Sequence, residues 1–516
     1  MKKTSNMPKR LGVACAIGLL ATSALAADEN PTGPGEPVPN VIGNSVVKIF
    51  ATLRNPDLAK PWSKQAPADI SGSGVVIDGH RILTNAHLVM YASQVQIQAN
   101  QAGDKLSATV VAVAPGIDLA VLKLDDDSFF DTHMPLARAD GLLQIKDAIL
   151  AYGYPTGGSS LSITKGIVSR VEFVTYNFPV SGLRIQVDAA INPGNSGGAA
   201  IADDKMIGLV FSRAGGDTQN IGYIIPNEEI SLFLNDIADG HYDGKPAMYD
   251  ELQTLENTSL RNFLHVDKSV TGMVVHRPRS TENSYPLKEW DVITRIGEWP
   301  IDDQGRVKVN HDLSVAFQYR VQQIARNGSV PLTIVRGGSS RQVQLPVDSV
   351  SPRLIPSLNG EYPSYFIYGP LVFSRASTQL LLAYAENAKL LLGLSFIGSP
   401  LISGLGAAPD PQHDDLVVVA SPFFPSSLAK GYDNPTGRVV ESVNGTHVRS
   451  IKHLVVLLRD LKDQFVVIAF ANRNGESMVF PRSEMLAATE GILADNGVRA
   501  RGSPDLMAVW QEKSTQ

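Results

Sequence analysis

The sequence predicts a mainly β protein in which two β-barrels precede two smaller modules of mixed α and β structure. A chain of 516 residues is too long for one hydrophobic core. From about Val46 to Phe233, short runs rich in β-branched residues alternate with Gly, Asn and Pro, as in barrels and sandwiches. Beyond that region, strands, one helical stretch and a hairpin follow one another twice.

Composition narrows the classes of function. Hydrophobic residues make up 43% of the chain and charged residues 19%, which indicates packed domains rather than disorder. The formal net charge of -6 argues against a protein that binds nucleic acid by neutralising phosphates. We therefore expect no nucleic-acid partner.

The first 26 residues have the features of a signal peptide. A basic start is followed by a short apolar run and by Ala24-Leu25-Ala26, a small-x-small cleavage pattern. The alternative, an uncleaved membrane anchor, is disfavoured because the run is shorter than the ~20 residues that span a bilayer. Residues 27–44, rich in Pro, Gly and acid, are expected to form a flexible arm. We therefore expect an exported protein, periplasmic or otherwise secreted. Cys15, the only cysteine of the sequence, lies in the predicted signal peptide, so the mature chain is expected to contain no cysteine.

The barrels are predicted from twelve strands within a domain spanning residues 45–240. The expected strands are 45–52, 72–78, 80–85, 93–99, 108–114, 119–124, 147–154, 163–171, 183–188, 197–202, 206–212 and 221–226.

Two further modules are expected over residues 248–350 and 351–516. The first contains a predicted helix over 314–328, and the second ends in a helical tail beginning near Glu484. The second loosely repeats the first, with 437–448 matching 290–301, which suggests two copies of one binding fold.

The segment INPGNSGG, residues 191–198, is the first motif that carries chemistry. A nucleophilic serine must present Oγ to a carbonyl while nearby backbone N–H groups point at the developing oxyanion, and a glycine-rich tight turn permits both. Ser196 is the candidate nucleophile. The oxyanion site would lie along Gly194, Asn195 and Ser196, with the N–H groups of Gly194 and Ser196 as donors. The alternative is an ordinary β-turn with an exposed serine.

Two other segments supply the partners of the serine. His87 follows the strand RILTN directly, so its imidazole is expected at a strand end facing a cleft, as a general base requires. Asp118 stands at the head of the strand LAVLKL and fits the acid that orients the base. The run of Asp125, Asp126 and Asp127 is an alternative source of that acid, but it reads more naturally as a solvated turn.

The chain order His, Asp, Ser is that of chymotrypsin-type proteases, and it differs from the order in subtilisins and α/β-hydrolases. Together the segments SGSGVVID, LTNAHLV, DLAVLKL, YGYPTGG, ITKGIVSRV, QVDAAINPGNSGGA and NIGYIIP resemble the protease blocks of the HtrA/Deg family. The later segments TGMVVHRP, WDVITRIGEWPI and PSYFIYGPLVF resemble the two PDZ modules of the plant-type Deg branch. The resemblance implies a chymotrypsin/trypsin-like double β-barrel followed by two PDZ-like α+β modules.

The same resemblance implies an ATP-independent serine endopeptidase that acts on misfolded or damaged proteins in protein quality control. Unfolded polypeptides would be its substrates, peptide segments would bind the PDZ-like modules, and the chain would form a homotrimer or a multiple of trimers. No cofactor is implied. In the place of a PDZ carboxylate loop we assign residues 263–266, where His265 stands instead of the usual glycine.

The substrate pocket is predicted from the residues around the nucleophile. Ala190, six positions before Ser196, takes the place of the aspartate that selects Arg or Lys, and Ile191 and Phe211 would complete an apolar pocket. Small or aliphatic side chains are therefore expected before the cleaved bond. A different kind of protein also fits the sequence: a chaperone or peptide-binding scaffold whose triad is normally misaligned. The segment PQHDDL, residues 411–416, is interpreted as a solvated loop, with no metal site.

Overall fold

The computed structural model describes residues 41–99, 103–177, 180–211, 221–471 and 476–512. The predicted signal peptide and most of the predicted arm lie outside these ranges, and residues 41–44 of that arm belong to helix α1 (Val41–Ser45). Among the described residues, no helix combines the length and the apolar character needed to cross a bilayer.

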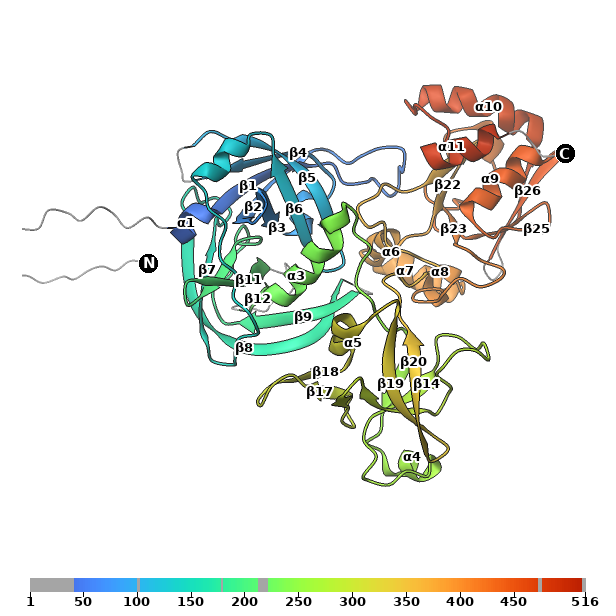
Figure 1. Cartoon of the computed structure of the whole chain (residues 1–516). Coiled ribbons are helices and arrows are strands. Elements are labelled where there is room, and N and C mark those ends of the chain that lie inside the picture. The colour runs from blue at the N-terminus through green and yellow to red at the C-terminus, as the bar shows by residue number, and fades with distance from the viewer. Residues whose placement is uncertain (1–40, 100–102, 178–179, 212–220, 472–475, 513–516) are drawn as a thin grey trace, which may run out of the picture. The chain divides into compact units, whose positions relative to one another are not determined.

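Strands β1 to β12 form two closed barrels of six strands each, as the sequence predicts (Figure 1). The strands of the first are β1 (Val46–Leu53), β2 (Ala68–Ile77), β3 (Arg81–Thr84), β4 (Ala92–Gln98), β5 (Leu106–Ala114) and β6 (Leu119–Leu124), with α2 (Ala86–Val89) and a 3₁₀ turn, η1 (Asp127–Asp131). The second contains β7 (Ala148–Gly153), β8 (Ser162–Asn177), β9 (Val180–Val187), β10 (Ala199–Ala202), β11 (Lys205–Phe211) and β12 (Gly222–Pro226). Helix α3 (Asn227–Asp236) and the turn η2 (Ile237–Asp239) follow.

Both barrels have the same strand order. The first runs β1-β2-β3-β6-β5-β4, and the second repeats this order as β7-β8-β9-β12-β11-β10. Each barrel has its own apolar core, and a third core joins them, with Val46, Leu83 and Leu119 from the first barrel against Tyr152 and Leu209 from the second. The end of β3 and the starts of β6 and β10 therefore contribute to this shared core through Leu83, Leu119 and Ala199, and the motif residues lie next to those strands in the sequence.

The next module is built on an antiparallel sheet of order β13-β14-β15-β19-β20. Its elements are β13 (Glu251–Thr254), α4 (Thr258–Phe263), β14 (Met273–Arg277), β15 (Val292–Ile296), β16 (Trp299–Pro300), β17 (Arg306–Lys308), β18 (Ser314–Ala316), α5 (Gln318–Ile324), β19 (Ser329–Arg336) and β20 (Ser339–Pro346). The helix predicted over 314–328 is thus shorter, because its first residues pair with β17 as strand β18.

The assignment of residues 263–266 as a carboxylate loop was wrong, because this segment is the C-terminal cap of α4. The N–H of Val266 donates to the carbonyl of Arg261 at 3.1 Å and the N–H of His265 to that of Asn262 at 3.2 Å, the pair of bonds that ends many helices. His265 takes the left-handed position of this cap, with φ 54°, where glycine is usual.

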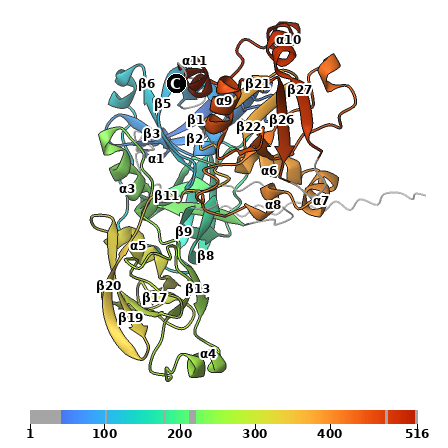
Figure 2. The same ribbon diagram turned by 90° about the vertical axis from the view of Figure 1, so that its right-hand side faces the viewer.

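The C-terminal region contains two sheets with helices packed against them (Figure 2). One has the order β21-β22-β23 and the other β25-β24-β26-β27. The strands are β21 (Tyr365–Tyr368), β22 (Leu371–Arg375), β23 (Val417–Val419), β24 (Val440–Val443), β25 (Thr446–His447), β26 (Phe465–Phe470) and β27 (Met478–Pro481). The helices are α6 (Thr378–Ala385), α7 (Ala388–Phe396), α8 (Pro400–Ser403), α9 (Ile451–Asp460), α10 (Arg482–Asp495) and α11 (Pro504–Gln511), with the turn η3 (Ser427–Ala429).

Strand β21 has partners on both sides. It pairs with β22, and on its other side Phe366 forms a bridge with Gly502. The N–H of Ile367 also donates to the carbonyl of Arg501 at 2.7 Å, and that of Ser503 to Tyr365 at 3.0 Å. The chain's own C-terminal segment therefore occupies this edge, where a peptide strand would otherwise add.

A buried carboxylate connects α3 with residues far along the chain. Glu229 is fully buried and accepts hydrogen bonds from the N–H of Leu183 at 2.7 Å and from Nε2 of Gln322 in α5 at 2.9 Å. Nζ of Lys245, whose side chain is also buried, lies 2.6 Å from the other carboxylate oxygen. Since both charged groups are buried away from water, the attraction between them offsets the cost of removing each charge from its hydration shell.

Candidate active site

His87 and Asp118 are brought together where the first barrel faces the second. His87 lies in the short helix α2 directly after β3, and Asp118 directly precedes β6, which pairs with β3. Nδ1 of His87 lies 2.7 Å from Oδ2 of Asp118, and the backbone N–H of His87 donates to Oδ1 at 2.8 Å. The histidine side chain is 43% exposed while that of the aspartate is 5% exposed. The buried acid therefore holds the Nδ1 edge of an imidazole that is otherwise partly exposed.

The backbone of Asp118 is held in an unusual conformation. Its φ is 57°, in the left-handed region that few residues other than glycine, asparagine and aspartate enter. The side chain of Asn85 donates from Nδ2 to the carbonyl of Asp118 at 2.9 Å, and both residues are buried. Asn85, from the motif that carries His87, thus positions the carboxylate through its main chain. Strained backbone of this kind is common at functional sites.

The turn before Ser196 has a defined orientation. The N–H of Asn195 donates to the carbonyl of Asn192 at 3.0 Å, and Gly194 has φ 98°. Proline at the second position and a positive φ at the third are the signature of a type II turn. The carbonyl of Pro193 accepts the N–H of Thr156 at 2.8 Å. Because N–H and C=O point in opposite directions across a trans peptide, the N–H of Gly194 points away from Thr156.

Ser73 in β2 ties this turn to the segment that carries the histidine. Its N–H donates to the carbonyl of Ser196 at 2.9 Å, and its hydroxyl donates to the carbonyl of Gly194 at 2.8 Å. The same hydroxyl accepts the N–H of Tyr154 at 2.8 Å. The carbonyl of Ser73 accepts the hydroxyl of Thr84, at the end of β3, at 2.8 Å. The fully buried Ser73 therefore fixes Ser196 relative to the strand that leads to the histidine.

Gly197 is required by this close approach. A Cβ on it would meet the carbonyl oxygen of Ser73 at 2.0 Å and the hydroxyl of Thr84 at 2.6 Å, and its φ is 83°. A Cβ on Gly198 would lie 2.0 Å from the carbonyl oxygen of Tyr152. At both glycines after the serine, neighbouring backbone atoms therefore occupy the place that a Cβ would take.

The three predicted pocket residues lie in different surroundings. Ala190 is exposed, and Ile191 is half-buried with its side chain over the backbone of Gly222. Phe211 is buried in the core between the barrels, its ring centroid 5.7 Å from that of Tyr176. The guanidinium of the buried Arg184 lies 5.5 Å from the Phe211 ring. The residues after Phe211 up to 220 lie outside the described ranges.

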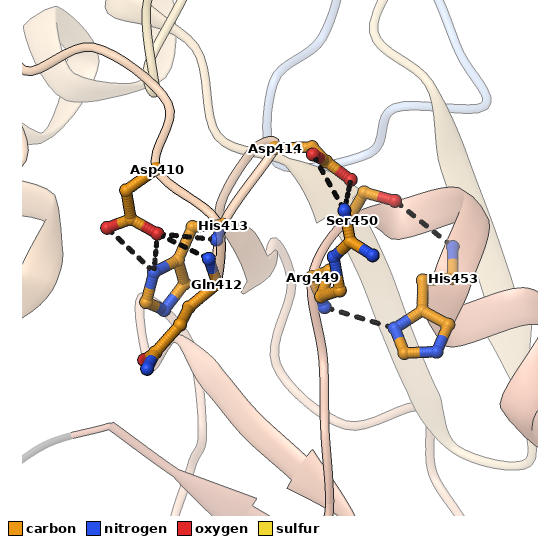
Figure 3. A network of polar contacts seen from close by, with 7 residues as sticks. All are labelled: Asp410, Gln412, His413, Asp414, Arg449, Ser450 and His453. Carbon is orange, nitrogen blue, oxygen red and sulfur yellow. Dashed lines mark hydrogen bonds and ion pairs between the residues drawn. The ribbon is translucent and has the colours of Figure 1, made fainter. Parts of the chain in front are cut away.

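The polar segment at 410–415 contacts the start of α9 (Figure 3). Nδ1 of His413 lies 3.1 Å from Oδ1 of Asp410, and Arg449 pairs with Asp414 at 3.3 Å. Nδ1 of His453 accepts the N–H of Arg449 at 3.2 Å. Burial, followed by the charges of Arg449 and His447, lowers the pKa of His453 below its usual 6.5. In the part of the chain that the structure describes, no three metal-ligating side chains are arranged to hold an ion.

Sequence reasoning missed Ser73 and Thr156 as contributors to the site. Ser73 contacts the second barrel through its hydroxyl and main chain, and Thr156 contacts the turn of Ser196 through its backbone N–H; the short segments around both residues contain no sign of those partners. The glycine-serine-glycine pattern at 72–74 is the sequence signal that could have indicated close packing around Ser73. The structure bears this out at Gly74, where a Cβ would lie 2.7 Å from the side chain of Ile82.

Comparison with known proteins identifies the family. The profile of the trypsin-like peptidase domain matches residues 72–209, and that of the PDZ domain matches residues 356–505. The chain is 34% identical to Protease Do-like 2, chloroplastic, of Arabidopsis thaliana, over 90% of this chain and 75% of the relative. It is 31% identical to Protease Do-like 4, mitochondrial, of the same plant, over 87% of this chain and 85% of the relative.

Among solved structures, the HtrA-type protease AlgW with decapeptide matches at 26% identity and a TM-score of 0.45, over 61% of this chain and 98% of that one. The identity and coverage shared with the Do-like relatives, together with the two domain matches, show the family. The chain is a serine endopeptidase with a trypsin-like peptidase domain and a PDZ domain, and it belongs to the HtrA/Deg family of Do-like proteases.

Proposed function

We propose that this endopeptidase cleaves peptide bonds with Ser196 as nucleophile, His87 as general base and Asp118 as the acid that orients the base. The observation that carries the proposal is the short contact of 2.7 Å between Nδ1 of His87 and Oδ2 of the buried Asp118. Bonded in this way, Nδ1 keeps its proton and leaves Nε2 free to accept one. The turn of Ser196 is joined to the same strands through Ser73.

The reaction follows from these contacts. Oγ of Ser196 attacks the scissile carbonyl carbon while its proton passes to Nε2 of His87, and the carboxylate of Asp118 stabilises the imidazolium. The carbonyl oxygen becomes an oxyanion, for which the N–H groups of Gly194 and Ser196 are the donors, with Asn195 between them in the turn. Collapse breaks the C–N bond, and the leaving amine takes the proton from Nε2. Water then hydrolyses the acyl-enzyme by the reverse proton transfers.

The orientation of the Pro193–Gly194 peptide supports this oxyanion site. Since the Pro193 carbonyl is taken by Thr156 at 2.8 Å, the opposite N–H of Gly194 is directed away from that contact. Removal of one such donor typically costs about 3 to 4 kcal/mol of transition-state stabilisation. The orientation of this single peptide thus governs a large part of the rate.

Substrates are proposed to carry small or aliphatic side chains before the cleaved bond. Ala190 replaces the acid that would select a basic side chain, and Ile191 adds an apolar surface. One methylene in such a pocket discriminates by only about 1 to 3 kcal/mol, so selectivity is loose. Loose selectivity suits misfolded or damaged polypeptides, whose Val, Ile and Leu side chains are accessible.

The chain is proposed to act in an exported or organellar compartment as a homotrimer or a multiple of trimers. A basic, apolar leader supports export. The names of the relatives refer to chloroplasts and mitochondria, which supports a compartment outside the cytosol. The proposed mature chain begins after residue 26, with the protease domain over 45–240 and the two PDZ-like modules over 248–350 and 351–516.

The test is digestion of β-casein by the mature protein and by a Ser196→Ala variant, with cleavage sites read by mass spectrometry. Cleavage after Val, Ile, Ala or Leu that disappears in the variant is the expected result. Cleavage that survives in the variant contradicts the assigned nucleophile. Casein left intact by both proteins favours the alternative, a chaperone or peptide-binding scaffold with a misaligned triad.

A further inference from the structure

The loop over residues 54–65, between β1 and β2, leaves the first barrel and packs on the C-terminal region. The hydroxyl of Ser421 donates to the carbonyl of Ala59 in this loop. The ring of Trp62 lies 5.2 Å from that of Phe424 and packs on an apolar cluster of the same region. The loop therefore forms part of a surface that neither region builds alone.

A solvent-open cavity of about 830 Å³ lies between the loop and the C-terminal region. Four basic residues line it: Arg54, Lys60 and Lys64 from the loop, and Arg499 from the segment after α10. Neither aspartate nor glutamate is among the lining residues, although the whole chain has a net charge of -6. Positive charge is therefore concentrated in one concave place on an acidic protein.

These cations are not neutralised by neighbours. Within the described ranges, none of the four is in an ion pair. Nε of Arg54 donates to the carbonyl of Gln65 at 3.1 Å, and Nζ of Lys64 lies 4.3 Å from the centroid of the Tyr362 ring. The one acid of the loop, Asp57, turns back on the loop and accepts the N–H of Lys60 at 3.0 Å.

Aromatic rings line the rest of the cavity. Tyr365 and Phe424 are buried, and Trp62 and Phe423 are half-buried. Such a volume is typical of sites that enclose a ligand, and aromatic walls with a few charged groups are their usual composition. A ligand that matches this cavity carries negative charge beside an apolar or aromatic group.

We propose that this cavity binds an acidic segment of polypeptide, in which carboxylates flank an aromatic or large aliphatic side chain. The carboxylates would pair with the four cations, and the apolar side chain would contact the rings. A polypeptide is favoured over other anions because the chain is an endopeptidase, and the inference rests on that activity. The outer edge of β21 is not the proposed binding place, since residues 501–503 already pair with it.

The test measures binding rather than cleavage, so that it is independent of the proposed nucleophile. The full mature chain carrying Ser196→Ala is titrated into a fluorescein-labelled peptide of alternating Glu and Phe, and anisotropy is recorded. A matched peptide of alternating Gln and Phe tests for charge. The expected result is saturable binding of the acidic peptide, weakened when salt rises from about 0.05 M to 0.5 M because screening shortens the reach of the charges. The neutral peptide is expected to bind at least about tenfold more weakly.

Charge-reversal variants locate the binding. The double variant Lys60→Glu with Lys64→Glu is expected to weaken binding of the acidic peptide about tenfold. Arg499→Glu alone, which alters a different side of the cavity, is expected to weaken binding by a similar factor. The control is Lys430→Glu with Lys462→Glu, two exposed lysines of the C-terminal region outside the cavity, which should leave affinity within about twofold.

Three results would overturn the inference. One is the absence of saturable binding, and another is binding that neither cavity variant weakens more than the control does. The third is binding of ATP or of vesicles with anionic lipid, lost in the cavity variants, while the acidic peptide fails to bind. If the peptide binds but casein cleavage survives Ser196→Ala, the proposed nucleophile fails and the cavity stands.

Discussion

Replacing Asp118 with asparagine tests the role assigned to the buried acid. The carboxylate accepts two N–H groups, the backbone N–H of His87 at 2.8 Å and Nδ1 of the same residue at 2.7 Å. An amide accepts one of them and presents its NH₂ to the other. If the amide NH₂ faced the backbone N–H of His87, two hydrogen-bond donors would oppose each other at a cost of about 1 to 3 kcal/mol. The amide oxygen should therefore accept the backbone N–H of His87.

The NH₂ group then faces Nδ1 of His87, which must lose its proton and act as acceptor. The ring proton moves to Nε2, where the proton of Ser196 has to arrive, and the base is blocked. We expect kcat to fall about 10⁴-fold, equivalent to about 5.4 kcal/mol in the barrier. Folding should be retained, because asparagine tolerates the left-handed backbone that Asp118 adopts at φ 57°.

The assay is steady-state cleavage of a quenched fluorescent peptide with valine before the cleaved bond, beside thermal melting of both proteins. Asp125→Asn is the matched control, since Asp125 is exposed and belongs to the run of three aspartates that was the alternative source of the acid; the kcat of this variant should stay within about twofold of the wild type. An Asp118→Asn variant that folds and retains more than a tenth of the wild-type kcat would refute the assigned role.

Three further predictions concern stability. Gly197→Ala should lower the free energy of unfolding by at least about 3 kcal/mol, because its Cβ would lie 2.0 Å from a backbone oxygen. Gly491→Ala in α10, where the new Cβ would meet open space, is the control and should be neutral or stabilising; chemical denaturation measures both. Lys245→Met should cost about 3 to 5 kcal/mol by leaving the buried charge of Glu229 unpaired, and adding Glu229→Gln should recover part of it in the same assay. The pKa of His453 is lowered in the folded chain, so the folded state binds fewer protons than the unfolded state. The free energy of unfolding should therefore fall as the pH drops from above 6.5 towards the pKa of the folded state. Melting curves at several pH values check this dependence, which a His453→Gln variant should lose.

The barrels were predictable because each strand carries its own signal. The strand at 46–53 alternates buried and half-buried residues towards its end, the strand at 119–124 is buried except at Lys123, and local turn residues separate such strands. The contact between His87 and Asp118 was also within reach, since both stand at strand ends that the barrel order brings together. In these cases local pattern and tertiary packing favour the same structure.

Other features depend on contacts that no local pattern encodes. Ser73 looks like any small residue in a strand, yet its hydroxyl and main chain hold the turn of Ser196 through contacts more than a hundred residues apart. The segment at 263–266 was misread because its pattern, with His265 between two apolar residues, also fits the end of a helix, where His265 takes the left-handed cap position that glycine usually fills. The packing of Trp62 on Phe424 likewise joins distant parts of the chain.

Labelling of the mature protein with a fluorophosphonate, followed by peptide mass spectrometry, tests directly whether Ser196 is the activated nucleophile. The reagent reacts with a serine only where a base activates it and donors stabilise the oxyanion. We expect one adduct, on Ser196, which is absent in Ser196→Ala and strongly reduced in His87→Ala. An adduct on another serine, or none in a folded protein that cleaves casein, would contradict this expectation.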